Sequence, residues 1–496
     1  MSGVAIPAPP KASHTASARR SPLGVRTRPL PHATLRALLS AVAVLALGLL
    51  ALRVLSERFP PGTTTADHPV FAVLAALVLS GTAWMALFPL IRRITLAGAP
   101  TRKLVLAGLG LAVLLRALFF GSHAIYEDDF RRYLWDGAVV TQGLDPYAHS
   151  PAEVAAPPAA TDSAQLARLK DMARESGNFP ATVNNPALTT IYPPAAQVPF
   201  AAAALIAPLD PDALRLVFLL VELATFALMV ASLRHYGRDP LWVLLYALCP
   251  LVIFAGFNTL HMDLLLAPAL VGALLWVRRR PLLAALALGL ASAVKVWPLV
   301  LGPVLFRRYR RQPLRYFGYG ALLGALTLAL LWPMLAHSIG QGSNSGLAAY
   351  SAGWVRSSFL FPLISDALTP LADDPGRLAR LCVAAAVTLS ALGFAFLAKP
   401  DPRTLSLALL AVTLVLLFLS PTGYPWYAIW VAVFLPFAPS RGAALLCVCV
   451  SLYYLRFWLG ETGRYSLYLD VLVPIQFAPP LLVLAFEAYR GRPLHD

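Results

Sequence analysis

The strongest constraint on this chain is a series of apolar runs that recur along its whole length. Each run is about 17 to 22 residues long, as in Val70–Ile91, which is enough to cross a hydrocarbon layer of ~30 Å as a helix. Only 13% of the 496 residues are charged, against roughly 25% in soluble domains. The alternating pattern of a membrane β-barrel is missing from the sequence. The chain is therefore predicted to be an all-α polytopic membrane protein with about 12 to 14 transmembrane helices.

The formal net charge of +16 gives the expected orientation of the chain in the membrane. Basic residues gather in short loops between the apolar runs, at 92–103, 278–280, 307–315 and 490–492. Short loops rich in Lys and Arg stay in the cytoplasm, so the charge is a topology signal and indicates no nucleic-acid partner. Both termini are expected to be cytoplasmic.

The topology divides the chain into regions. The piece at 195–208 precedes a span that ends at basic residues, so it is expected to enter and leave the membrane on the same side. The four cysteines all lie in apolar segments and show no disulfide or metal-binding spacing. The expected regions are a disordered basic cytoplasmic tail (1–32), spans 1–3 (33–120, the third at Leu104–Phe120), an extracytoplasmic loop with amphipathic surface helices and an acidic catalytic motif (121–192), a transmembrane bundle with re-entrant or short hairpins (193–336), a second extracytoplasmic loop (337–380), C-terminal spans (381–488) and a cytoplasmic tail (489–496).

Polar and aromatic residues that topology does not explain converge on the outer face. They come from six separate parts of the chain, and this convergence is the main sign of function in the sequence. They are Glu127, Asp128, Asp129, Arg131, Arg132, Asp136, Asn184, Asn185, Tyr192, His261, Asp263, Lys295, Trp354, Arg356, Tyr424, Trp426 and Tyr427.

The acidic motif has two interpretations. A helix over Asp128–Gln142 would place Asp128 and Asp129 one turn from Arg132, as a capped and salt-bridged helix on the membrane surface. Alternatively, one carboxylate is a general base that removes a proton from an attacking hydroxyl, while its neighbour orients it. The sequence leaves open which of the two aspartates would be the base, and we favour Asp128.

Lys295, His261 and Asp263 lie beside apolar segments. An ammonium flanked by hydrocarbon is costly, so Lys295 indicates either a functional site or a side chain that reaches the surface. It would suit a lipid phosphate. His261 and Asp263 begin an apolar run, where a structural role is as good an explanation as a functional one.

Aromatic residues and prolines mark two further turns, T-I-Y-P-P and P-T-G-Y-P-W-Y. They match the aromatic belt of a membrane interface, but two rigid turns facing one acidic site also suit sugar stacking. No glycine-rich phosphate loop is present in the sequence, which argues against a soluble nucleotide sugar as substrate at this face.

From about residue 120 onward the chain resembles bacterial GT-C glycosyltransferases, in particular their mannosyltransferase-like branch. D-D-F-R-R-Y-L-W-D-G-A-V-V-T-Q-G-L-D-P-Y is similar to that branch's first outer loop, and N-N-P-A-L-T-T-I-Y-P-P is similar to its N-H-P-x-x-x-T-I-Y-P-P string. H-M-D, K-V-W-P, W-V-R-S-S-F and Y-P-W-Y follow in the same order. This chain differs from the branch at Asp145, Asn185 and Ser357, positions that bear on the choice of sugar and acceptor.

The resemblance implies a GT-C-like fold in a bacterial inner membrane, with the active site outside and Asp128 as base. It implies an inverting transfer of a hexose, mannose first among them, from a polyprenyl phosphate to a lipid-linked or envelope glycan. No cofactor is expected, and the sequence indicates no divalent metal but leaves metal dependence open. We assign Asp128 and Asp129 to catalysis, and Lys295, Arg131, Arg132 and His261 to the donor phosphate. Substrate-binding roles go to Tyr192, Asn184, Asn185, Asp136, Asp263, Trp354, Arg356, Tyr424, Trp426 and Tyr427. The alternatives are a flippase or transporter of lipid-linked glycans, which would place ionisable groups near the membrane midplane, and a glycan polymerase or ligase.

Overall fold

The computed structural model describes residues 31–60, 68–342, 345–397 and 402–491, and all its regular elements are helical. The longer helices are α1 (His32–Ser56), α2 (Val70–Met85), α3 (Leu87–Leu96), α4 (Arg102–Ala117), α5 (Asp129–Thr141), α7 (Ala164–Glu175), α8 (Pro194–Ile206), α9 (Pro211–His235), α12 (Leu266–Trp276), α13 (Pro281–Val294), α15 (Pro313–Gln341), α18 (Pro375–Phe396), α19 (Pro402–Leu419) and α24 (Val473–Tyr489). The shorter α-helices are α6 (Pro151–Ala155), α10 (Leu244–Ala247), α11 (Pro250–Ile253), α14 (Gly302–Leu305), α16 (Gly346–Gly353), α17 (Phe361–Leu368), α20 (Ala428–Ala432), α21 (Arg441–Cys449), α22 (Leu455–Glu461) and α23 (Tyr465–Leu467).

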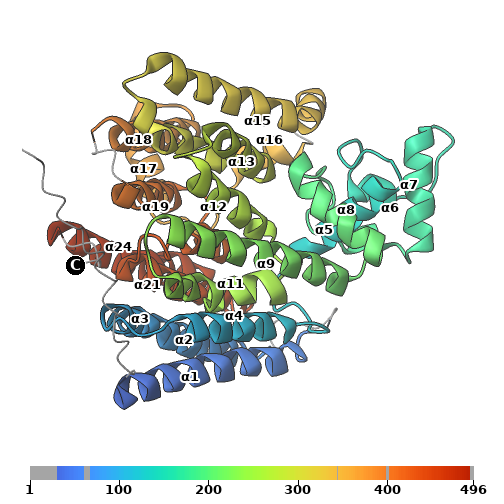
Figure 1. Ribbon diagram of the computed structural model, residues 1–496. Helices are drawn as coiled ribbons and strands as arrows, with labels where there is room; N and C mark the ends of the chain where they lie inside the picture. Colours follow the sequence, from blue (N-terminus) through green and yellow to red (C-terminus); the bar gives the residue numbers. More distant parts are fainter. Residues whose placement is uncertain (1–30, 61–67, 343–344, 398–401, 492–496) are drawn as a thin grey trace, which may run out of the picture.

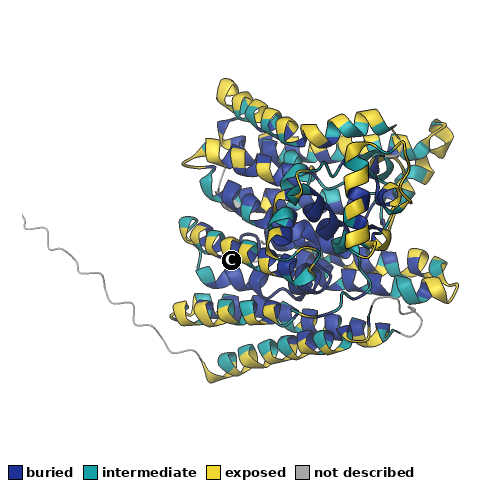
Figure 2. Ribbon diagram, turned by 90° about the vertical axis from the view of Figure 1, so that its right-hand side faces the viewer, coloured by how far each residue is buried: buried dark blue, intermediate teal, exposed yellow. Residues whose placement is uncertain are grey.

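The helices form a layered bundle, with α5 to α8 projecting at one end (Figure 1). Figure 2 looks onto that end and shows the buried residues gathered at the centre, while α1 at the lower edge is largely exposed. Apolar side chains exposed on the bundle's outer wall, such as Leu314 and Ile339, suit contact with lipid. The prediction of an all-helical polytopic membrane protein is therefore confirmed.

The described residues contain seven helices, counting directly continuous ones together, that are long and apolar enough to cross a membrane. Pro240–Ala247 and Pro250–Asn258 form a further pair bent by 54°, and four apolar helices are shorter. The expected 12 spans are reached only when the bent pair and all four shorter helices are counted. The expected tail at 1–30 lies outside the described residues, and α1 begins at His32.

Two predicted boundaries are wrong. The third span was expected at Leu104–Phe120, but α4 ends at Ala117 and, at 16 residues, is shorter than the helices that are long enough to span. The second outer loop was expected to begin at residue 337, but α15 continues to Gln341.

Arg116 shows how the bundle tolerates a charge in its interior. Arg116 Nη2 lies 2.6 Å from Glu222 Oε2 on α9, and both side chains are fully buried. Tyr246 donates a 2.6 Å hydrogen bond to the other Glu222 oxygen. Arg116 Nη1 also donates to the carbonyl of Ala247, at the break before Pro250. The pair is tolerated because both charges are neutralised and hydrogen-bonded.

The helix starts follow local chemistry. Proline occupies the first helical turn of α9, α13, α15 and α18, where its missing N–H costs nothing. Asp210 and Asp374 cap α9 and α18 by accepting backbone hydrogen bonds. Ser150 and Glu153 form a reciprocal capping box on α6. Prolines and capping residues of this kind mark where these helices begin.

Candidate active site

The bundle contains a cavity of about 820 Å³ at the end where α5 to α8 project. Thirteen of the sixteen predicted site residues line this cavity, and they are Asp128, Asp129, Arg132, Asn184, Asn185, Tyr192, Asp263, Lys295, Trp354, Arg356, Tyr424, Trp426 and Tyr427. Arg131, His261 and Asp136 do not line it. The volume is large enough for a sugar phosphate, within the usual range of ligand pockets.

The acidic motif lies at the start of α5 and is held by the loop at 184–193. Asn184 Nδ2 donates to Asp128 Oδ1 at 2.8 Å and to Asp129 Oδ1 at 2.7 Å. Asp128 is the N-cap residue of α5, but its side chain makes no capping hydrogen bond. The expected capped surface helix is thus wrong in this respect, because Asn184 takes the carboxylate away from the helix end.

Burial raises the pKa of both aspartates, and neighbouring carboxylates add to this effect only at Asp129. Burial is the largest effect on Asp129, the Asp128 and Asp263 charges add to it, and together they raise its pKa to about 6 despite Asn184 and Lys295. Burial also raises the pKa of Asp128, while Asn184 and Arg131 lower it. At neutral pH both carboxylates are therefore available as proton acceptors, with Asp129 closer to its titration range.

Helix α5 lies inside the protein, so the expectation of an amphipathic surface helix is wrong. Every residue from Arg132 to Val139 is buried. A Cβ at Gly137 would lie 2.3 Å from the Phe200 carbonyl oxygen, so only glycine lets α8 approach this closely. Tyr133 stacks on Phe200 with ring centroids 4.6 Å apart. This close packing fixes the acidic end of α5 at the cavity.

The carboxylate of Asp263 anchors the opposite wall of the cavity. Lys295 Nζ donates to Asp263 Oδ1 at 2.8 Å, and Trp430 Nε1 donates to the same oxygen at 2.6 Å. The Lys295 ammonium also lies 4.2 Å from the centroid of the Tyr427 ring. Helix α13 ends at Val294, so Lys295 occupies the break before the next helical turn. Lys295 thus reaches the cavity as predicted, but its charge is shared with Asp263.

A stack of three aromatic rings packs next to the acidic motif. Tyr424 stacks on Trp426 at 4.6 Å, and Trp426 stacks on His261 at 3.6 Å. His261 is fully buried, with Nδ1 3.8 Å from Asp129 Oδ2. His261 was predicted to bind the donor phosphate, but Trp426 covers it and it does not line the cavity. Its position instead suits support of Asp129.

At the cavity rim, two segments that lie far apart in the sequence pair directly with each other. Arg356 and Thr422 form an isolated parallel bridge, in which Gly423 N donates to the Arg356 carbonyl at 2.9 Å. Ser357 has a φ of 50° and contacts Tyr468, its hydroxyl 2.6 Å from that of Tyr468. The pairing places Arg356 and Tyr424 on the same rim.

Arg131, Arg132 and Asp136 make hydrogen bonds within the protein, and of the three only Arg132 lines the cavity. Arg131 donates to the Thr182 carbonyl, outside the lining. Arg132 lines the cavity, but one nitrogen of its guanidinium donates to the backbone carbonyls of three residues, Asn184, Asn185 and Leu188. Asp136 is buried behind it and accepts from Thr190 and Gln197. These contacts occupy Nη2 of Arg132, and Asp136 lies outside the cavity lining.

Several cavity residues had no assigned role in the sequence analysis. They are Tyr126, Glu127, Trp297, Tyr350, Trp430, Tyr453, Arg456 and Phe457. Arg456 could have been found, because a charge inside the apolar run of the span Arg441–Glu461 is itself a functional signal. The aromatic residues could not, since aromatic side chains are common throughout such spans. Among the described residues, no group of three or more His, Cys, Asp and Glu is arranged to hold a metal ion.

The fold and the cavity define a class of protein: a polytopic helical membrane protein whose half-buried acidic pair faces a cavity of substrate size. A family model, Glycosyltransferase family 87, matches residues 190–421. The matched segment includes Asp263, Lys295 and Arg356 and ends before Tyr424. No curated protein and no solved structure matches the chain. The family match and the apolar helices together support a membrane glycosyltransferase.

Proposed function

We propose that the protein transfers a hexose, mannose being the first candidate, from a polyprenyl-phosphate donor to a hydroxyl of a lipid-linked or envelope glycan. The transfer would occur at the extracytoplasmic face of a bacterial inner membrane. The observation that carries the proposal is the pair Asp128 and Asp129, joined by one Asn184 amide and facing a cavity walled by aromatic and cationic side chains. Carboxylates beside aromatic rings suit the hydroxyls and apolar faces of a sugar.

In the proposed reaction Asp128 is the general base. The acceptor hydroxyl gives its proton to the Asp128 carboxylate as its oxygen forms a bond to the anomeric carbon. The bond from that carbon to the phosphate oxygen breaks, and its electron pair stays on the phosphate. A single displacement inverts the anomeric centre, and the sugar carries oxocarbenium-like charge in the transition state.

The contacts of the two aspartates differ, and we assign the two residues different roles in the proposed reaction. Asp129 accepts a hydrogen bond from Asn184 and lies 3.8 Å from Nδ1 of the buried His261. Asn184 is the single side-chain hydrogen-bond partner of Asp128 among the described residues. We therefore assign orientation and electrostatic support to Asp129 and proton removal to Asp128. Lys295 is assigned to Asp263 and to the aromatic wall, because both contacts use its charge.

The test is a transfer assay in proteoliposomes with a panel of polyprenyl-phosphate hexoses. Asp128→Asn should lower the rate by about 10²–10³-fold or more while the variant still binds donor. Asp171→Asn is the matched control, because Asp171 is exposed on α7 and pairs only with Arg174. Full activity of Asp128→Asn would refute the base assignment. A wild-type protein that transfers none of these sugars would refute the donor class.

A further inference from the structure

Three arginines line the cavity, Arg132, Arg356 and Arg456. Lys295 is paired with Asp263, and Arg132 is bound to backbone carbonyls. Arg356 and Arg456 also line the cavity, and among the described residues neither has a carboxylate oxygen within 4.0 Å. Arg356 is exposed at the rim, where it bonds the carbonyl of its own neighbour Val355. Arg456 lies deeper and is the stronger candidate for binding an anion.

Aromatic side chains hold Arg456 in position. Its guanidinium lies 4.8 Å from the ring centroids of both Tyr453 and Phe457, and it donates to the Tyr453 hydroxyl. A planar guanidinium fixed between rings keeps its remaining N–H groups in a defined direction. Because the group is pre-oriented, an incoming phosphate would bind with little loss of side-chain entropy.

The position of Arg456 suits an anion that arrives on a lipid. Arg456 lies in α22, near the end of the candidate span Arg441–Glu461. Two residues further on, Trp458 packs edge-on against Phe71 at 5.2 Å, and Phe71 is exposed at the start of α2. The guanidinium is thus a short distance along the helix from the apolar outer wall of the bundle. A lipid-anchored headgroup would meet it at the boundary of the hydrocarbon layer.

Glu127 supplies the second polar group at this end of the cavity. Its Oε1 atom is buried and has no hydrogen-bond partner in the structure. The preceding residue, Tyr126, has a φ of 66°, which is unusual for an aromatic residue, and its ring stacks on Phe457 at 4.4 Å. The stacking holds the chain in this left-handed conformation. Glu127 is thereby directed to the same end of the cavity as Arg456.

The protonation of Glu127 differs from that of its neighbours. Burial is the main cause that raises its pKa well above the usual range, and the charges of Asp129 and Asp128 add to it, while Arg456 opposes them. A neutral carboxyl group keeps a proton that it can donate in a hydrogen bond. A neutral donor beside a cation is a combination that binds phosphate oxygens.

We propose that Arg456 and Glu127 form the phosphate-binding end of the cavity and receive the phosphate of a prenyl-phosphate carrier. The inference rests on the proposed glycosyl transfer and names its phosphate site. As the bond to the anomeric carbon breaks, negative charge grows on the leaving phosphate oxygen. Arg456 stabilises that charge and the Glu127 O–H donates a hydrogen bond to it, without losing its proton. The acceptor's proton ends on Asp128.

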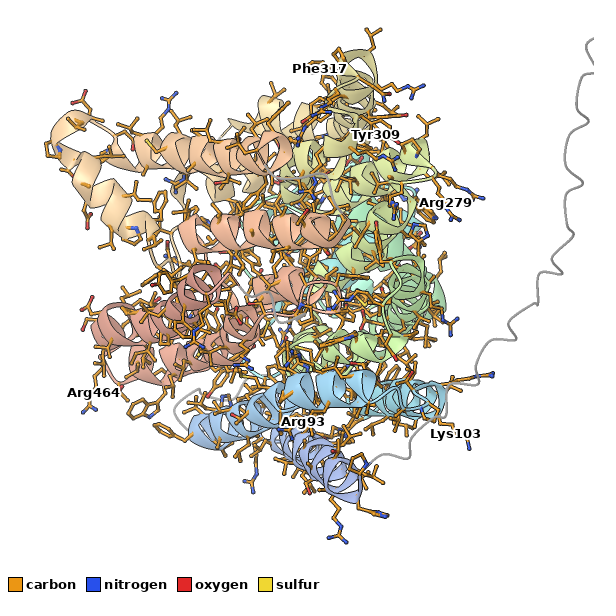
Figure 3. The ribbon with its side chains drawn as sticks, turned by 60° about the vertical axis from the view of Figure 1, so that its left-hand side comes forward. Arg93, Lys103, Arg279, Tyr309, Phe317 and Arg464 are labelled. Atoms are coloured by element: carbon orange, nitrogen blue, oxygen red, sulfur yellow. The ribbon has the colours of Figure 1, made fainter. Side chains whose placement is uncertain are left out.

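The experiment measures binding of undecaprenyl phosphate, with undecaprenol as the uncharged control, to the protein in lipid nanodiscs by native mass spectrometry. Arg456→Gln should weaken phosphate binding by about tenfold or more and leave undecaprenol binding unchanged. Arg456→Lys should be intermediate. Arg464→Gln, at an exposed residue labelled at the edge of Figure 3, should match wild type. Thermal melting of each variant shows that it is folded.

Two variants, Glu127→Gln and Glu127→Ala, test whether the Glu127 side chain acts as a hydrogen-bond donor or as an ionised base. The glutamine amide still donates, so Glu127→Gln should bind undecaprenyl phosphate within about threefold of wild type, and its transfer rate should fall by less than about tenfold. Glu127→Ala should weaken binding. Unchanged phosphate binding by Arg456→Gln, or loss of transfer in Glu127→Gln as large as in Asp128→Asn, would overturn the inference. Phosphate binding that needs Arg456 in a protein that transfers no sugar would overturn only the proposed function.

Discussion

Asn184 Nδ2 lies 2.7 Å from Asp129 Oδ1, although 55 residues separate the two along the chain. The same nitrogen lies 2.8 Å from Asp128 Oδ1. One amide therefore holds two carboxylates that repel each other when both are ionised. Because the N–H group stabilises the ionised form, it keeps both acids available as proton acceptors near neutral pH.

Asn184→Ala should shift the acidic limb of the pH–rate profile to higher pH. Loss of the hydrogen bond raises the pKa of Asp128 and Asp129, since Asn184 lowers both. A hydrogen bond to a charged group contributes about 1.5–3 kcal/mol, which corresponds to a shift of about 1–2 pH units. The rate should therefore fall most near pH 6 and recover as the pH rises. Gln142→Ala, which removes an exposed amide at the other end of α5, should leave the profile unchanged. A profile that drops equally at every pH would argue against this role.

Lys295→Met should destabilise the protein by about 3 kcal/mol. The substitution leaves Asp263, which is 2% exposed, without its cation. The value lies at the low end for a broken buried pair, because a quarter of the Lys295 side chain is exposed and Trp430 still donates to Asp263. The double variant Lys295→Met, Asp263→Leu should recover much of the loss, as measured by the thermal melting midpoint. Lys103→Met, at an exposed residue, is the control. A double variant less stable than Lys295→Met would contradict the pairing argument.

Asp136→Asn should make stability less dependent on pH. Burial is the main cause that raises the pKa of Asp136 to about 6, so the folded state favours its neutral form. Its contribution to stability is fully present below pH 3.8 and is lost as the pH rises through about 6, with a span of about 3 kcal/mol. Asparagine keeps an acceptor for Thr190 and Gln197 but has no proton to lose as the pH rises.

The check for Asp136 is the change in melting temperature between pH 4.5 and pH 8, in wild type and variant. Wild type should lose more stability over this interval than Asp136→Asn. Asp129 titrates in the same direction in both proteins, so the difference between the two slopes isolates Asp136. Parallel slopes would show that Arg132 keeps Asp136 ionised throughout.

Gly423→Ala should separate the two rim segments and lower transfer. A Cβ at this position would lie 2.3 Å from the Ser357 carbonyl oxygen and 3.0 Å from the Phe477 ring, so the backbone would have to move. Forcing an extra carbon into a packed site costs typically 1–3 kcal/mol. Gly353→Ala adds the same methyl group where nothing lies within 4 Å, and should leave stability and transfer unchanged. Comparable activity in the two variants would show that the pairing of Arg356 with Thr422 is dispensable.

Much of the architecture could be predicted from the sequence because the membrane imposes a simple rule on it. Apolar runs of sufficient length predict helices, and the loops between them predict which ends lie together. That rule alone indicates that Asp128, Lys295, Arg356 and Tyr424 share one face. The structure places them around one cavity, although their chemical roles remain predictions.

The orientation of individual side chains could not be predicted, because partners far along the chain decide it. Helical spacing pairs Asp128 with Arg132, but Arg132 binds carbonyls at Asn184 to Leu188, and Asp128 binds the Asn184 side chain. Gly137 indicates a flexible or close-packed position, but only the fold shows that α8 lies against it. Local patterns therefore located the site, while its internal hydrogen bonds depended on tertiary contacts.

The buried pair of Arg116 and Glu222 has a consequence for how the chain enters the membrane during synthesis. Helix α4 has three basic residues and is a poor candidate for insertion by itself, and the carboxylate that neutralises Arg116 is made 106 residues later. We expect α4 to remain at the translocation channel, or in the interface, until α9 has been synthesised. The two helices would then enter the lipid together. At that step the helices would not insert in strict N-to-C order. The acidic motif would already have been synthesised before α4 is inserted.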